Sequence, residues 1–217
     1  MLCALFLAAG CSGNSTTALV AQLHDGDPQV RRAAALRLGD APDDPTAAAV
    51  ALSDALADVD LEVRELAAGS LARLGANAKA SVPALEEALQ DPESSVRLTA
   101  ALALQKVDPA SQQYVPVFID ALRAGDGTAF LEVGRMGPQA QWAVPTLTSL
   151  LSDHRTKIRA LAAHSLGGIG PTAREARDEL QQRTRDTNAS VRKAAQKALR
   201  QIGSHDESEG VSPRRDG

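Results

Sequence analysis

The histidines of this chain, which could hold a metal ion or transfer a proton, are few and far apart. Three of the four histidines, His24, His154 and His205, lie in turns or in the tail, and His164 stands alone in a helical segment. No two histidines are spaced at i and i+4, which would bring two imidazoles to one metal ion. No nucleophile has a plausible base beside it, and no glycine-rich loop follows a strand. The sequence therefore predicts no catalytic residue, no metal and no cofactor, and it disfavours an enzyme.

The other reactive group is the thiol of Cys11. Residues 1–11, MLCALFLAAGC, are apolar and uncharged and end in small residues, but a bilayer-spanning helix needs about 20 apolar residues. LAAGC resembles a bacterial lipobox, in which the chain is cleaved before the cysteine and the thiol carries diacylglycerol. This resemblance implies a signal peptide at 1–10, lipid on Cys11, a polar tether at 11–15, and a place on the periplasmic or outer-surface side of the cell envelope.

Two features of this amino terminus leave alternatives open. No Lys or Arg precedes the apolar stretch, and the stretch is short for a signal peptide. The start codon could lie further upstream, or the segment could be an apolar start that leads into the first helix, in which case the protein is cytoplasmic. If the signal is cleaved, Cys3 leaves with it and the mature chain has neither a free thiol nor a disulfide.

One pattern recurs along most of the chain. It is built on a Val or Ile, here called the origin (Val30, Val63, Val96, Ile158 and Val191), with Ala four residues later and Leu eight residues later. The origins are 33, 33, 62 and 33 residues apart, so the long gap holds one further, shortened unit. Each origin is followed by an Arg and preceded, five residues earlier, by an Asp; these ladder residues are Asp25, Arg31, Asp58, Arg64, Asp91, Arg97, Asp153, Arg159, Asp186 and Arg192. A fixed period of this length predicts a solenoid of stacked units.

Each unit is a pair of helices. Positions 0, 4, 8 and 11 from the origin fall on one face of a 3.6-residue helix, which we call helix B. Asp27, Asp60 and Asn188 stand where its N-cap is expected. An earlier helix, helix A, is clearest in VPALEEALQ at 82–90 and VPTLTSLLS at 144–152. The fold class is therefore all-α, an α-solenoid of about six helix pairs over residues 16–204, with a disordered tail at 205–217.

These helix pairs resemble HEAT repeats. The resemblance rests on the Asp in the turn, the Val-Arg pair that opens helix B, and endings such as LARLG and LGGIG. It is closest to the short bacterial kind found in phycobilin lyase subunits, and it implies that the turn Asp and the helix-B Arg pair along the stack as a ladder. Because HEAT repeats serve many roles, the resemblance is specific for fold and weak for function.

The fourth repeat, residues 110–138, departs from the pattern. Four residues are missing between Leu122 and Val133, where GDGT replaces the acidic turn and the Val-Arg pair. About one helical turn is therefore removed from the turn and helix B, and a charged contact of the ladder is lost. Every aromatic residue outside residues 1–11 lies in or just after this repeat: Tyr114, Phe118, Phe130 and Trp142. The rings either fill the gap beside a shortened helix or anchor a partner, because Trp and Tyr are frequent in binding hot spots.

The remaining features favour a binding role. A net charge of −4 and the absence of a basic stripe with aromatic residues argue against nucleic-acid binding. HEAT arrays line their concave side with helix B, so positions 3, 6, 7 and 10 should face a partner; they include Arg37, Asp40, Ser70, Arg73, Thr99, Lys106, His164, Ser165, Lys197 and Gln201. The candidate partner-binding residues are Arg37, Arg73, Lys106, Tyr114, Phe130, Trp142, His164 and Lys197.

The functional prediction is a membrane-anchored lipoprotein that acts as a non-catalytic scaffold and binds another protein through helix B. The alternative is a phycobilin-lyase-like subunit that handles a cofactor or assists assembly of a protein complex. No motif identifies the partner.

Overall fold

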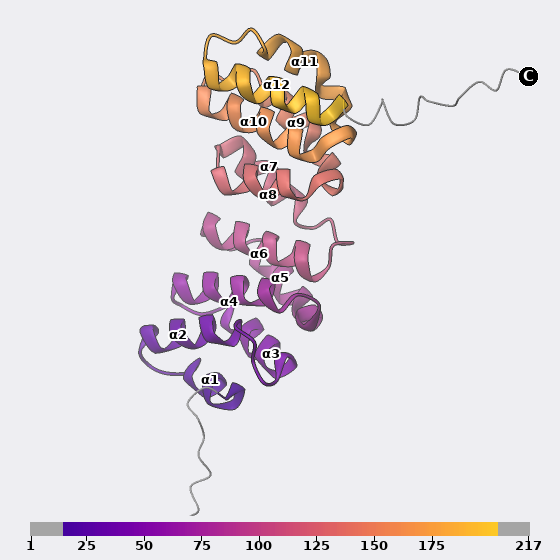
Figure 1. Ribbon diagram of the computed structural model, residues 1–217. Coiled ribbons are helices and arrows are strands. Elements are labelled where there is room, and N and C mark those ends of the chain that lie inside the picture. Colours follow the sequence, from indigo (N-terminus) through magenta and orange to yellow (C-terminus); the bar gives the residue numbers. More distant parts are fainter. Residues whose placement is uncertain (1–14, 204–217) are drawn as a thin grey trace, which may run out of the picture. The chain divides into compact units, whose positions relative to one another are not determined.

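The computed structural model describes residues 15–203, and every regular element among them is helical (Figure 1). The chain divides into two compact units, residues 1–117 and 118–217. The signal peptide at 1–10, Cys11, most of the tether at 11–15 and the tail at 205–217, including His205, lie outside the described residues. The all-α fold predicted from the sequence is confirmed for the described part.

The first unit contains three helix pairs. The pairs are α1 (Thr16–Gln22) with α2 (Pro28–Leu38), α3 (Pro45–Ala55) with α4 (Leu61–Leu74), and α5 (Val82–Ala88) with α6 (Ser94–Val107). A 3-10 helix, η1 (Gly75–Ser81), leads into α5. The helices of type B, α2, α4 and α6, pack side by side (Figure 1).

The second unit contains the end of α7 (Val115–Ala124), in which the boundary lies, followed by α8 (Gly127–Arg135). Two further pairs follow, α9 (Val144–Leu150) with α10 (Thr156–Ile169) and α11 (Arg177–Arg183) with α12 (Ala189–Gly203), each introduced by a 3-10 helix, η2 (Gly137–Ala143) or η3 (Gly170–Ala176). Here α10 packs between α8 and α12 (Figure 1).

Helix B begins where the capping residues predict. The carboxylates of Asp27 and Asp60 accept from the backbone N–H groups of Gln29 and Val63, and the Asn188 side chain accepts from Ser190. Behind the caps, the residues at position 8 in four of the repeats, Leu38, Leu71, Leu104 and Leu166, are fully buried. The spacing in the sequence therefore identifies both the start and the buried face of these helices.

The shortened fourth repeat is confirmed. Helix α8 has 9 residues, whereas α4, α6 and α10 have 14 each. Its N-cap is Asp126, whose carboxylate accepts from Thr128 and Ala129. Asp126 lies 33 residues before Arg159 and is therefore at position 1 of its repeat. The N-caps Asp27 and Asp60 are at position −3, four residues earlier in the repeat. The first turn of helix B is thus absent, and the chain turns through Gly125 at φ 88°.

Candidate functional site: the outer face of the B helices

In the first unit the ladder pairs predicted by the resemblance form between consecutive repeats. The guanidinium of Arg31 donates to both carboxylate oxygens of Asp58, and Arg64 does the same to Asp91, with shortest N–O distances of 2.7 Å. The third nitrogen of each arginine donates to carbonyl oxygens of its own turn, such as those of Asp25 and Asp58. Each arginine therefore links the end of its own helix A to the next repeat. In the second unit Arg159 and Asp186 form the equivalent pair.

The ladder keeps its carboxylates ionised. Burial is the largest single influence on Asp58 and Asp91 and raises their pKa, but the hydrogen bond from Arg31 or Arg64, a backbone N–H donor and the nearby positive charge together lower the pKa of both groups. A hydrogen bond from Arg159 lowers the pKa of Asp186. A parallel pair lies beside the ladder, where hydrogen bonds from Arg32 lower the pKa of Asp60 to about 2. These charges stabilise the stack and are structural.

Four ladder residues make other contacts. Arg97 and Arg192 each donate to two carbonyl oxygens of their own turns. The Asp25 carboxylate accepts from the N–H of Asp27. Asp153 binds Arg155, two residues away, through two hydrogen bonds of 2.9 Å. No arginine of repeat four reaches Asp153, because that repeat has no Val-Arg pair.

Arg155 supplies the contact that the missing arginine would have made. Its guanidinium holds Asp153 and also donates to the carbonyl oxygens of Arg123 and Ala124 at the end of α7. Hydrogen bonds from Arg155 lower the pKa of Asp153. The ladder ion pair expected to be lost at repeat four is therefore absent, but Arg155 connects repeats four and five from the opposite side. The signal in the sequence was an Arg at the position where other repeats carry a capping acceptor.

Ser70 and Ser165, at position 7 of α4 and α10, are not surface residues, contrary to the expectation. Both side chains are fully buried between neighbouring B helices. The Ser70 hydroxyl donates to the carbonyl oxygen of Ala35 at 2.7 Å, and the Ser165 hydroxyl donates to that of Phe130 at 2.6 Å. A slot that admits only a small side chain lies here, because adjacent B helices approach closely. The solvent-facing residues are those at positions 3, 6 and 10, which we call the outer row.

Five partner-binding candidates on the B helices keep some exposure. Arg73, Lys106, His164 and Lys197 are exposed and belong to the outer row, whereas Arg37, at position 7 of α2, is half-buried. Arg73 also binds the Asp40 carboxylate at 3.2 Å and the carbonyl oxygen of Leu36 at 3.0 Å. Two large apolar residues at position 6, Leu36 and Leu131, are each 43% exposed.

The aromatic candidates have mostly a core role. Phe130 and Phe118 are fully buried and Tyr114 is 5% exposed, so Tyr114 and Phe130 do not present their rings to a partner. Trp142 is half-buried, and its ring lies 5.9 Å from that of Phe118, centroid to centroid, at 48°. Phe118 and Phe130 are therefore core residues of the second unit. Of the three aromatic candidates, Trp142 keeps the most exposure.

Glycine forms part of the outer face in the second unit. A Cβ on Gly168 would lie 2.5 Å from the carbonyl oxygen of Gly134, so α8 and α10 approach to backbone contact. Gly168 is nevertheless exposed to solvent. On the outer face of α8 and α10, Gly134 and Gly168 therefore present backbone without side chains. Arg135 on α8 and His164 on α10 are exposed on the same face.

Two pockets formed by the described residues lie away from this face. One of 230 Å³ is lined by residues at the end of α3 and on α5, including Leu56 and Ala84. Another, of 480 Å³, lies at the turns before α10 and α12 and is lined by the paired Arg159 and Asp186. Within residues 15–203 no three His, Cys, Asp or Glu side chains gather into a possible metal site. None of the helices in this range is long and apolar enough to span a bilayer.

The family model for HEAT repeats matches residues 16–105, 51–132 and 144–212, which together cover most of the sequence. The chain belongs to the HEAT-repeat family. The expected resemblance to HEAT repeats is thereby confirmed, and the pairs Arg31–Asp58, Arg64–Asp91 and Arg159–Asp186 are contacts that this resemblance implied. No curated protein matches the HEAT-repeat chain.

Solved structures share the fold at low sequence identity. An engineered protein is 24% identical with a TM-score of 0.54, and the match covers 87% of this chain and 96% of that one. The complex of CpcE and CpcF of phycocyanin lyase from Nostoc sp. PCC7120 is 22% identical with a TM-score of 0.57, over 94% and 82%. A designed armadillo repeat protein in complex with the peptide (KR)4 is 17% identical with a TM-score of 0.59, over 85% and 98%. At these identities the likeness concerns the fold alone.

Proposed function

We propose that this HEAT-repeat protein is a non-catalytic scaffold that binds another protein through the outer row of its B helices. The observation that carries the proposal is the exposure of Leu36 and Leu131, two large apolar residues at the same repeat position. Position 6 is exposed in α2, α8, α10 and α12. Exposed apolar side chains among polar residues are typical of protein-binding surfaces. A designed solenoid of the same fold holds a peptide, which supports this use.

The test compares apolar-to-charged variants inside and outside the outer row. Leu36→Glu and Leu131→Glu place a carboxylate in the outer row. Val50→Glu on α3 and Val59→Glu in the turn before α4 are matched controls, because Val50 and Val59 are 54% and 93% exposed and lie outside the outer row. Co-purification from cells should recover the partner with the wild type and both controls but not with the outer-row variants. Recovery with all four variants, or loss with the controls as well, would refute the proposal.

We further propose that the protein is held at a membrane of the cell envelope by lipid on Cys11. The support is the sequence of residues 7–11, LAAGC, and the nearness of Cys11 to Thr16, where α1 begins. Labelled palmitate should enter the wild type and not Cys11→Ser. Equal incorporation of palmitate into both proteins, or none into either, would contradict the lipid anchor. Neither result would bear on the proposal that the outer row binds a protein.

A cofactor-handling subunit of the phycobilin-lyase kind is the competing function. The similarity to the CpcE and CpcF complex is the observation in its favour. The two functions separate in one measurement, because a subunit that holds a tetrapyrrole should purify with visible absorbance when it is produced beside the pigment. A colourless protein that retains a partner through the outer row supports the scaffold.

A further inference from the structure

The charged residues are distributed unequally between the two units. The described part of the first unit, residues 15–117, has eight Lys and Arg and 15 Asp and Glu, a net charge of −7. The described part of the second, residues 118–203, has 13 Lys and Arg and eight Asp and Glu, a net charge of +5. The second unit is therefore basic, although the net charge of the whole chain is −4. The positive electrostatic potential around this unit attracts anionic groups.

Within the second unit the positive charge is concentrated on the B helices. Helices α10 and α12 contain Lys157, Arg159, Arg192, Lys193, Lys197 and Arg200 and no Asp or Glu. Arg159 and Arg192 belong to the ladder and its turns, so their donors are engaged. Lys193, Lys197 and Arg200 are exposed on α12. The positive charge on α12 is therefore open to a partner.

The outer row of this unit combines cations with an apolar strip. Arg135 and Lys197 are exposed at its two sides, with His164 between them on α10. Leu131 is 43% exposed and Leu161 is half-buried on the same side of α8 and α10. The carboxylate nearest this surface in sequence, Glu132, is occupied by Arg135 at 2.7 Å. The glycine floor at Gly134 and Gly168 lets a bound chain approach the helices closely.

We infer that the α8–α10–α12 outer row binds an acidic segment of the partner protein, one with Asp or Glu side chains around apolar residues. This inference rests on the proposed scaffold function and names the chemistry of its partner. Carboxylates would lie against Arg135, His164 and Lys197, and apolar side chains against Leu131. Complementary charge of this kind raises the association rate and selects the partner. The same surface disfavours basic segments, because α10 and α12 carry no carboxylates to receive them.

The experiment uses the full chain and two peptide probes, a short polyglutamate peptide with interspersed leucines and a polylysine peptide of the same pattern. Binding is measured by fluorescence anisotropy at low and at physiological salt. The acidic peptide should bind and the basic one should not. Arg135→Glu combined with Lys197→Glu should weaken binding of the acidic peptide by about tenfold or more, and salt should weaken it in the wild type.

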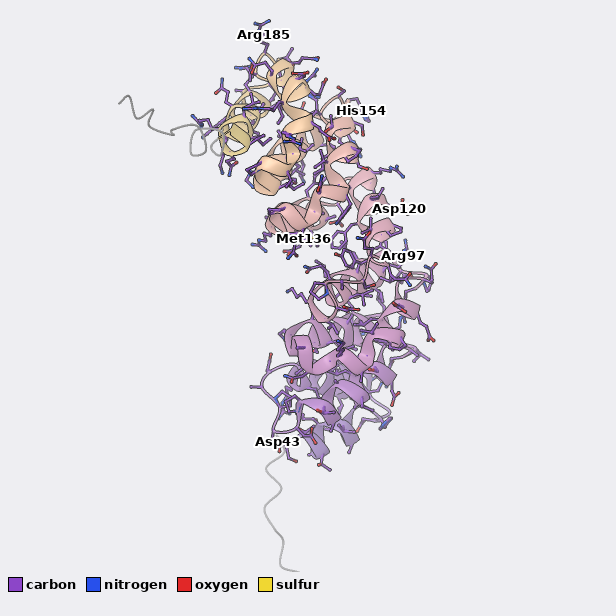
Figure 2. All side chains as sticks on the ribbon, turned by 90° about the vertical axis from the view of Figure 1, so that its right-hand side faces the viewer. Asp43, Arg97, Asp120, Met136, His154 and Arg185 are labelled. Carbon is purple, nitrogen blue, oxygen red and sulfur yellow. The ribbon has the colours of Figure 1, made fainter. Side chains whose placement is uncertain are left out.

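The matched control is Arg174→Glu combined with Arg185→Glu, which changes the net charge equally. Both arginines are exposed outside the outer row, Arg174 in η3 and Arg185 in the turn before α12, where Figure 2 labels it. This control should change the affinity for the acidic peptide by less than about threefold, because Arg174 and Arg185 lie outside the outer row and salt screens their charges over that distance. Equal weakening by both pairs would overturn the inference, because the net charge alone would then explain the binding. Thermal melts of both variants verify that they are folded.

Three further outcomes would overturn the inference. The first is preference for the basic peptide, and the second is no binding of either peptide. The third is binding only to vesicles of phosphatidylglycerol and not to the acidic peptide, which would assign the basic face to a lipid surface. If the outer-row leucines still prove necessary for co-purification in any of these cases, the scaffold function stands and only the acidic chemistry of its partner is wrong.

Discussion

Arg155 occupies the capping position of helix α10, three residues before the origin Ile158. Its side chain makes no capping hydrogen bond there, whereas Asp27 and Asp60 cap their helices at the same position. The lost cap costs α10 about 1 kcal/mol. In exchange, the guanidinium connects Asp153 to the carbonyl oxygens at the end of α7. Arg155 thus makes no capping hydrogen bond in its own helix, but it connects repeats four and five.

We predict that Arg155→Ala lowers the melting temperature, because both the Asp153 carboxylate and the α7 carbonyl oxygens lose their donor. Lys157→Ala is the control, since Lys157 is an exposed cation in the first turn of the same helix. Circular dichroism melts measure the difference. Arg155→Asp separates the two roles of the position, because it restores a capping acceptor but removes the bridge. If Arg155→Asp melts at or above the wild-type temperature, the bridge is not stabilising.

At the scale of the elements, the B helices pack through small residues at positions 7 and 9–10. Ser70 and Ser165 fit the slot and satisfy a carbonyl oxygen of the preceding helix. Gly39 lies against Ser70, where an added Cβ would be 2.7 Å from the Ser70 Cβ. The distance between neighbouring B helices therefore depends on the small size of these serine and glycine residues as much as on the packing of the buried leucines.

We predict opposite effects for alanine at two helical glycines. Gly168→Ala would place a Cβ 2.5 Å from the carbonyl oxygen of Gly134, so α8 and α10 must separate, at a cost of about 1–3 kcal/mol. Gly69→Ala in α4 meets no atom closer than 3.9 Å and should stabilise the protein by about 0.5–1 kcal/mol through helix propensity. Urea unfolding of both variants gives the comparison. A neutral or stabilising Gly168→Ala would show that the two helices are not in backbone contact.

Across the whole molecule, both units depend on ionised carboxylates. The pKa values of Asp58, Asp91, Asp153 and Asp186 are lowered by their arginine partners, and that of Asp60 falls to about 2. A carboxylate in an unfolded chain titrates near about 3.9. The unfolded state therefore binds protons at a higher pH than the folded state does, so these groups contribute their full stability above about pH 4.

We predict that the free energy of unfolding is nearly constant from about pH 7 to about pH 5 and falls as the pH drops from about 4 to about 2. Urea titrations at a series of pH values measure this slope. Asp60→Asn should make the slope shallower, and Glu87→Gln, at an exposed position of α5 outside the ladder, serves as the control. A free energy that rises on acidification in this window would contradict the role of the ladder.

The sequence by itself determined the repeat, the helix pairs, their caps and the shortened fourth unit. These features depend on local spacing, since a 3.6-residue period places Val30, Ala34 and Leu38 on one face wherever the helix lies. The partners of Arg31 and Arg64 were implied by the resemblance to HEAT repeats, in which the turn Asp and the helix-B Arg pair along the stack. The exposed cations Lys106 and Lys197 were identified from their positions around the axis of helix B.

Only the tertiary structure decided which polar positions are open. Ser70 and Ser165 appear on a helical wheel as surface residues, but the preceding B helix covers both side chains, and its distance is set by packing between repeats. Phe130 occupies position 5, which is likewise covered by a neighbouring helix. Arg155 could not be assigned from its own repeat, since its partners include the end of α7, about 30 residues earlier in the chain. The spacing of residues along one helix specifies directions around its axis, whereas burial depends on how closely the neighbouring helix approaches.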